Sequence, residues 1–260
     1  MKATLPARPF SLLIWFALPA AILLSLVLNP PHELDAALAR VVWANGAFPF
    51  QDEETLLVIH RYAALVPALI ALCALKELAR PFFPRFLAQP SALERAETGR
   101  DGYLLAAMLC CIATVWWLKG TTGVYCPWST EGFGGSVPLA SPTFSLSFRS
   151  GKCWPGGFAG TGFCMFALYF AFRDRHPDLA RAGLAFALAF GGFCSAVQMI
   201  RGAHFLSHNL ATLCIDWLVC ASVYCTAFAR AEVVRQLSPA GLGMALAQTL
   251  GLKSAAKKEA

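Results

Sequence analysis

The sequence predicts an all-α, polytopic membrane protein with about six transmembrane helices and both termini in the cytoplasm. Hydrophobic residues make up 57% of the 260 residues and charged residues only 14%, whereas soluble chains average about 25% charged. The mean hydropathy is +0.57. Several apolar runs also approach the roughly 17–25 residues that cross a bilayer. Together these features favour a membrane-embedded helical bundle over a soluble domain.

Six apolar runs account for the predicted spans, in chain order. The first exceeds the core of a signal peptide and is expected to stay uncleaved, with Pro19 tolerated inside it. The second, third and fourth are short and must borrow flanking residues. We expect one helical domain over residues 1–236 and a cytoplasmic tail over 237–260. The predicted spans are residues 10–28, 62–78, 103–118, 158–172, 179–200 and 205–228.

Positive charge predicts the orientation of these spans. If they alternate, 15 of the 21 Lys and Arg residues lie on the side that holds both termini. The positive-inside rule assigns that side to the cytoplasm. The loops at residues 29–61, 119–157 and 201–204 then face outward, which for a cell (inner) membrane means the periplasm or exterior.

Four of the six outward cations lie close to the membrane surface, in the loops around residues 119–157 and 201–204. They are Lys119, Arg149, Lys152 and Arg201. One interpretation is ordinary interfacial anchoring, and the other is a pocket for an anion. Arg201 favours the pocket, because it lies between two spans with almost no loop, where a charge is costly without a partner.

Two further features of the outward loops bear on chemistry. Cys126 and Cys153 are the two cysteines in the long loop, where a disulfide can form in an oxidising compartment. The segment "CWPGGFAG" turns into the fourth span, so its Gly156 and Gly157 N–H groups can bind phosphate at a helix start. Close helix packing through small residues is an equally good interpretation of these glycines.

His204 and His208 are four residues apart and share one helix face. Three interpretations stay open: structural histidines, ligands of a haem or metal, or a nucleophile at His204 that forms a phosphohistidine. Arg201, one turn earlier, can hold phosphoryl oxygens for such a nucleophile.

The segments "LKGTTGVYCPW", "CWPGGFAG" and "RGAHFLSHNL" resemble, in this order, the type 2 phosphatidic acid phosphatase superfamily, which is related to acid phosphatases and vanadium haloperoxidases. The resemblance covers about residues 60–230. It implies a helical membrane protein that dephosphorylates lipid phosphates without metal or other cofactor. It places the phosphate-binding lysine at Lys119, the glycine motif at Pro155–Phe158 and the nucleophile at His204.

The sequence also departs from the motifs of this family at several positions. Phe158 stands where the family has a histidine that protonates the leaving oxygen, and phenylalanine has no proton to give. Gln198 stands at the position of the family's arginine, and Arg201 is the substitute that we expect. His208 stands at the position of an orienting aspartate, so His208, Asn209 or a backbone carbonyl must orient His204. Lys152 or a bound water is a candidate proton donor.

We therefore expect a lipid phosphate phosphatase or phosphotransferase that acts at the outer face. One alternative is a catalytically impaired relative that binds phosphorylated lipid, and another is a haem or metal protein using His204 and His208. The expected partners are a phosphorylated lipid and the bilayer. Nucleic acid is excluded, because the basic residues follow the cytoplasmic loops without interleaved aromatics. The sequence favours no particular lipid phosphate and no oligomeric state.

Overall fold

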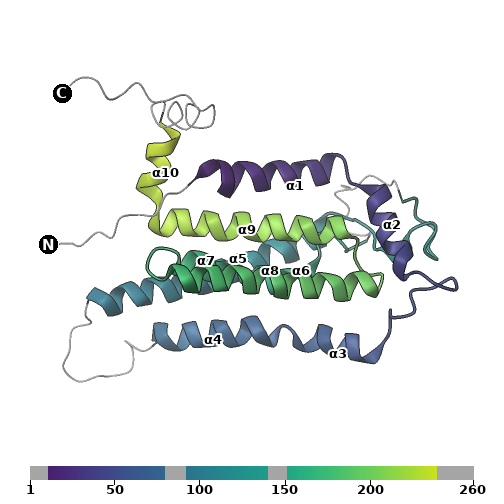
Figure 1. Ribbon diagram of the computed structural model, residues 1–260, viewed down its shortest axis with the longest axis horizontal. Coiled ribbons are helices and arrows are strands. Elements are labelled where there is room, and N and C mark those ends of the chain that lie inside the picture. The colour runs from purple at the N-terminus through teal and green to yellow at the C-terminus, as the bar shows by residue number, and fades with distance from the viewer. Residues whose placement is uncertain (1–10, 80–91, 140–150, 239–260) are drawn as a thin grey trace.

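The computed structural model describes residues 11–79, 92–139 and 151–238, and this part of the chain is helical and contains no β-strand. Most helices run side by side along one long axis (Figure 1). They are η1 (Leu13–Ala17, a π-helix), α1 (Leu18–Leu28), α2 (His32–Val42), α3 (Glu54–Tyr62), α4 (Leu65–Ala79), α5 (Ala92–Thr121), the 3-10 turn η3 (Pro127–Ser129), α6 (Gly157–Phe163), α7 (Phe166–Phe172), α8 (Pro177–Ile200), α9 (Leu206–Phe228) and α10 (Arg230–Leu237).

Four segments are long and apolar enough to cross a membrane, which confirms the helical, membrane-protein character predicted from the sequence. They are Glu54–Ala79, Gly99–Thr121, Pro177–Ile200 and Leu206–Phe228. The pair Leu13–Leu28 and His32–Val42 counts as a fifth only if it is taken as one span bent by 80°. The second predicted span indeed borrows flanking residues, because it begins at Glu54 rather than Tyr62.

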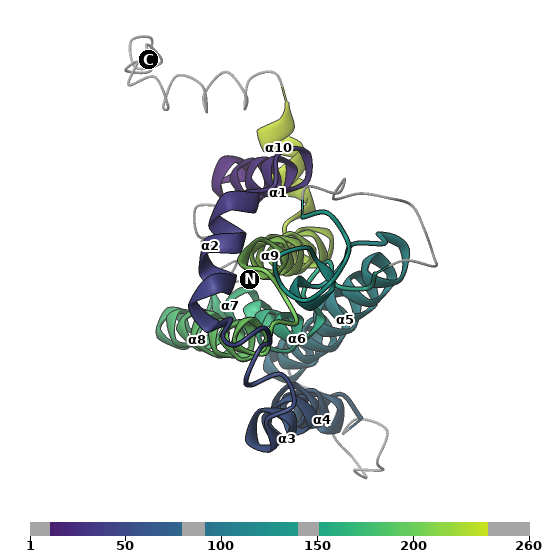
Figure 2. The same ribbon diagram turned by 90° about the vertical axis from the view of Figure 1, so that its right-hand side faces the viewer.

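Within the described residues the expected count of six spans is not confirmed, because the first predicted span qualifies only as part of the bent pair and the fourth is short. Gly157–Phe172 is a shorter apolar segment, interrupted between α6 and α7. At about 1.5 Å per residue it extends roughly 24 Å, less than the roughly 30 Å of a bilayer core. Its position compensates for its length, because α6 and α7 pack against α5, α8 and α9 in the middle of the bundle (Figure 2).

Close backbone contact fixes α6 against α8. A Cβ atom added to Gly162 would lie 2.3 Å from the Cα atom of Gly191, so neither position has room for a side chain. Phe166 and Phe170 of α7 are buried in the same core. Small residues in α6, whose sequence begins "GFAG", therefore let this helix lie at the centre of the fold.

The three segments predicted as outward loops meet at one end of the bundle. The N–H of Trp128 donates to the carbonyl of Gly202 at 3.3 Å, and Nε of Arg201 donates to the carbonyl of Gln51 at 2.9 Å. The segment 29–61 is not simply a loop, because it forms α2 and α3. Helix α2 lies across the end of the bundle, while α10 lies at the opposite end (Figure 1).

Candidate active site

Arg201 and His204 lie in the tight turn between α8 and α9. Gly202 has a φ of 69°, and the carbonyl of Gln198 accepts the N–H groups of Ala203 at 2.9 Å and His204 at 3.3 Å. This turn places His204 two residues before the first residue of α9. Both side chains are buried, although they lie in the connection between two apolar helices.

Gln198 holds Arg201 in place. Nη1 of Arg201 donates to Oε1 of Gln198 at 2.9 Å, and its Nε donates to the carbonyl of Gln51. Gln198, at the position where the family has an arginine, is therefore the hydrogen-bond partner of Arg201, which stands one turn later. These two bonds fix the plane of the guanidinium, which leaves its other N–H groups for a ligand.

His204 and His208 face each other across the beginning of α9, with ring centroids 5.9 Å apart. The main chain of Cys153 lies within hydrogen-bonding reach of both imidazoles. Nδ1 of each ring is buried and has no hydrogen-bond partner within the described part of the chain. Buried polar atoms are normally paired, so these two nitrogens mark a place where a polar ligand fits.

Burial lowers the pKa of His204 well below its usual value, and the positive charge of Lys119 acts in the same direction. Hydrogen bonding to the main chain of Cys153 opposes this shift but does not reverse it. His204 is therefore a neutral imidazole at neutral pH. A neutral imidazole has the lone pair that a nucleophile requires.

Gly156 joins α6 to α9 rather than offering a free N–H group. Its N–H donates to the carbonyl of His208 at 3.1 Å, and its carbonyl accepts the hydroxyl of Thr212 at 3.1 Å. A Cβ atom here would lie 2.3 Å from Oδ1 of Asn209. The N–H and the carbonyl of Gly156 are thus both hydrogen-bonded within the protein. The buried amide of Asn209 packs on Gly156.

Lys119 lies near the end of α5, beside the start of α6. A Cβ atom on Gly157 would lie 3.4 Å from Cδ of Lys119, so the lysine chain passes directly over this glycine. The N–H groups of the first turn of α6 have no acceptor within the helix. Lys152 is exposed, and Arg149 lies outside the described residues.

A disulfide joins Cys126 and Cys153, whose Cα atoms are 5.1 Å apart. The N–H of Cys153 donates to the carbonyl of Val124 at 2.9 Å, and the hydroxyl of Thr122 donates to the carbonyl of Trp154 at 2.7 Å. The chain before α6 is thus fastened to the chain after α5. This arrangement positions the main chain of Cys153 next to His204 and His208.

Phe158 is buried against Cys194 and Val197 of α8. The ring of His60, from α3, meets the ring of Phe158 edge-on, with centroids 4.6 Å apart. His60 was not predicted from the sequence as a site residue, because it lies far from the three motifs and in a segment expected to be a loop. The one sequence feature that marks His60 is its polar side chain at the start of an apolar run.

Asp35 supports the start of α9 from α2, and no motif in the sequence pointed to it. It is buried on α2, where Oδ1 accepts the N–H of Ser207 at 3.0 Å and Oδ2 accepts the Ser207 hydroxyl. Asp35 therefore caps the first turn of α9 from another helix. Within residues 11–79, 92–139 and 151–238, no group of three or more His, Cys, Asp or Glu side chains is arranged to hold a metal ion.

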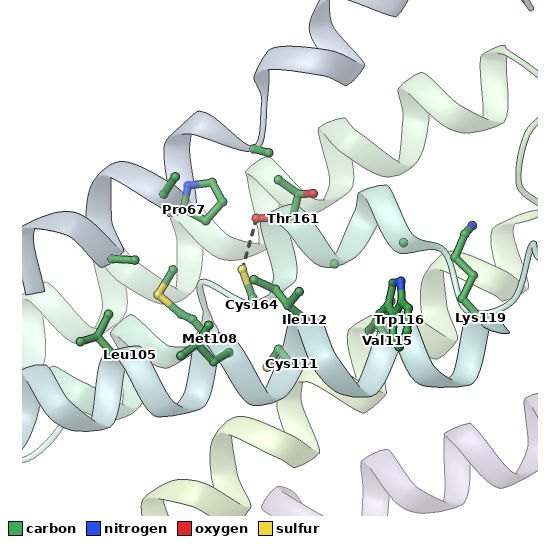
Figure 3. Close-up of a pocket in the computed structure, with 16 residues that line it drawn as sticks. Pro67, Leu105, Met108, Cys111, Ile112, Val115, Trp116, Lys119, Thr161 and Cys164 are labelled. Atoms are coloured by element: carbon green, nitrogen blue, oxygen red, sulfur yellow. Dashed lines mark hydrogen bonds between the residues drawn. The ribbon is translucent and has the colours of Figure 1, made fainter. Parts of the chain in front are cut away.

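An apolar cavity of about 380 Å³ opens beside Lys119 and Gly157. We call it the α4–α5 groove. Figure 3 shows Lys119 at one end of a row of α5 residues that includes Trp116, Ile112 and Met108. The facing wall is formed by Pro67 and Ala68 of α4 and by Ala64 just before it, and the floor by residues of α6 such as Thr161.

Comparison with known proteins places this site in a family. A family model described as the PAP2 superfamily matches residues 102–232. Comparisons with curated proteins and with solved structures gave no match. The matched segment contains Lys119, Arg201 and His204, whereas His60 and Asp35 precede it. Because the match covers half of the chain and carries the clustered site residues, the protein belongs to the PAP2 superfamily.

Proposed function

We propose that the protein is a membrane-embedded phosphatase that removes phosphate from a lipid at the outer face, through a phosphohistidine on His204. Family membership supports phosphatase chemistry. The apolar helices support membrane association. The lipid substrate, the covalent intermediate and the side of the membrane are argued below from the site itself.

The observation that carries the proposal is the continuity between the cationic site and the α4–α5 groove. Lys119 and Gly157 belong to both, and the rest of the wall is almost entirely apolar. A volume of about 380 Å³ is in the range of ordinary ligand pockets, roughly 300–1,000 Å³. A lipid phosphate matches this shape, with its charged group at Lys119 and its hydrocarbon chain between α4 and α5.

We assign the following roles in the reaction to these side chains. Lys119 and Arg201 supply positive charge to the phosphoryl oxygens, and Arg201 is pre-positioned by Gln198. His204 attacks phosphorus as a neutral imidazole while the main chain of Cys153 orients its ring. A covalent phosphohistidine divides one difficult displacement into two easier ones.

The disulfide supports an outward-facing site. Cys126 and Cys153 are joined next to His204, and disulfides persist in oxidising compartments such as the periplasm. Lys152→Cys should react with a membrane-impermeant maleimide in intact cells, whereas Arg175→Cys, in the loop between α7 and α8, should react only after permeabilisation. Labelling of Arg175→Cys alone in intact cells would reverse the orientation.

The function is tested by phosphate release from the purified protein in detergent with a chelator present. We expect release from phosphatidate, with loss of activity in His204→Ala. Ala68→Phe, which fills the α4–α5 groove, should reduce kcat/KM for phosphatidate but spare a small soluble aryl phosphate. Leu69→Phe, at an α4 position outside the groove, is the matched control. Equal loss on both substrates in Ala68→Phe would refute a lipid chain in the groove.

One observation favours a second candidate, a relative that binds phosphorylated lipid without hydrolysing it. Phe158 occupies the position of the family's proton donor and is packed into the core. Under this alternative, phosphatidate would bind in a manner sensitive to Lys119→Ala, but no phosphate would be released above background.

A further inference from the structure

Cleavage of an alkyl phosphate needs a proton donor, and the site must supply it without Phe158. The leaving oxygen of a lipid phosphate becomes an alkoxide unless it is protonated in the transition state, and such proton transfer contributes typically ~10²–10⁴-fold to the rate. Arg201 stays protonated in proteins and cannot act as the acid. His204 is occupied as the nucleophile. A titratable group other than these two must therefore donate the proton.

The imidazole of His60 lies next to Phe158, the residue that stands at the position of the family's proton-donating histidine. Its ring lies edge-on to the Phe158 ring at 4.6 Å, although the two residues come from α3 and α6. Leu56 and Ile59, on the same helix, pack against the Phe158 cluster and hold α3 in this position. The aromatic ring of Phe158 thus forms a wall for the imidazole.

The contact with Phe158 brings His60 to the start of α6. Phe158 directly follows Gly157, and the side chain of Lys119 passes over that glycine, 3.4 Å from where its Cβ atom would lie. His60 and Lys119 therefore both lie beside the first turn of α6. A phosphate dianion bound at Lys119 adds negative charge next to His60, which favours the protonated ring.

The α4–α5 groove decides on which side the leaving oxygen lies. That oxygen joins the phosphate to the lipid, so it faces the groove, and phosphoryl transfer requires the nucleophile on the opposite side, in line. His60 lies one turn before Ala64, which lines the groove. It is exposed near the beginning of the Glu54–Ala79 span, whereas His204 and His208 are buried.

We propose that His60 is the general acid of the reaction, a role that rests on the proposed phosphatase function. As the His204 nitrogen bonds to phosphorus, the bond from phosphorus to the lipid oxygen breaks and that oxygen takes the proton of the His60 imidazolium. A water molecule then attacks phosphohistidine and gives a proton to neutral His60. The second step releases phosphate, frees His204 and restores the acid.

The test compares substrates that differ in their need for an acid. In His60→Gln, phosphate release from phosphatidate should fall ~10²–10⁴-fold. Release from p-nitrophenyl phosphate, whose leaving group departs without a proton, should fall much less. His176→Gln is the matched control, because His176 is also exposed and also meets a phenylalanine ring, that of Phe172, but lies at the far end of α8.

A double variant separates the proposed acid role of His60 from a structural effect of replacing it. His60→Phe with Phe158→His exchanges the two rings, and it should regain phosphatidate hydrolysis that His60→Phe alone has lost. If wild type is active and sensitive to His204→Ala but His60→Gln hydrolyses phosphatidate normally, the phosphatase proposal stands and the His60 assignment is overturned. Equal losses on both substrates would likewise overturn it. If wild type hydrolyses neither substrate, both proposals fail.

Discussion

Asp35 and Ser207 form a paired contact between two helices although 172 residues separate them. The carboxylate accepts both the N–H and the hydroxyl of Ser207, in the first turn of α9. That turn follows His204 and contains His208. A residue of α2, outside the segment matched by the family model, therefore caps the helix that carries His208.

Replacing Asp35 by Ala should destabilise the protein and slow the reaction. The change leaves the buried N–H and hydroxyl of Ser207 unpaired, which costs about 1–3 kcal/mol. We expect a lower apparent Tm in detergent together with a lower kcat for phosphatidate. Glu33→Ala is the control, because Glu33 is exposed on the same helix. An unchanged Tm in Asp35→Ala would contradict the capping role.

Gln198→Leu should weaken catalysis by releasing Arg201. The variant removes a hydrogen bond to a charged group, worth about 1.5–3 kcal/mol, so kcat/KM should fall roughly 10- to 100-fold. Gln51→Leu is the matched control, because Gln51 contacts Arg201 through its main-chain carbonyl. Steady-state kinetics that show equal effects of the two substitutions would argue against the side-chain contact.

Breaking the disulfide should affect stability and activity together. Cys126→Ser removes a cross-link between positions 27 residues apart, which typically contributes about 2–4 kcal/mol. It also frees the main chain of Cys153 beside the two histidines. A reductant should lower the apparent Tm of wild type and of the control Cys73→Ser, yet leave Cys126→Ser unchanged. Insensitivity of wild type to reductant would refute this role.

His204 should make stability depend on pH. Its pKa is lowered in the folded protein, whereas an unfolded histidine titrates near 6.5. Above that pH both states are neutral and the full stability is present. As pH falls below about 6.5 only the unfolded state gains the proton, so the free energy of unfolding falls by up to about 1.4 kcal/mol per pH unit.

The measurement is the apparent Tm between pH 7.5 and 5. His204→Gln should reduce the slope, and His176→Gln, at an exposed position, should keep it. Retention of the full wild-type slope in His204→Gln would mean that another group carries the effect.

Lys119, Arg201 and His204 were predicted from motifs that follow one another in a fixed order, and their roles stay predictions. The two cysteines of the long loop are the pair that forms the disulfide in the structure. The helical class followed from apolar runs, because bilayer spans require them. The number of spans could not be predicted from these runs. Helices α6 and α7 are covered by neighbouring helices, so they need not be as long as a lipid-exposed helix.

His60 and Asp35 could not be predicted in this way. Each reaches the site through a contact between distant segments, from a region that the hydropathy pattern assigned to a loop. The role of Gly156 was also hidden, because "PGG" is compatible with phosphate binding and with close packing. Only the bond from its N–H to the His208 carbonyl separates the two.

Trapping the intermediate tests the central claim most directly. Purified wild type is mixed with phosphatidate labelled in its phosphate group, quenched with denaturant at alkaline pH, where phosphohistidine survives, and digested for peptide mapping. We predict label on the peptide that carries His204, at that residue, and none in His204→Gln. Turnover of phosphatidate with label on another residue, or undiminished turnover in His204→Gln, would contradict the phosphohistidine mechanism.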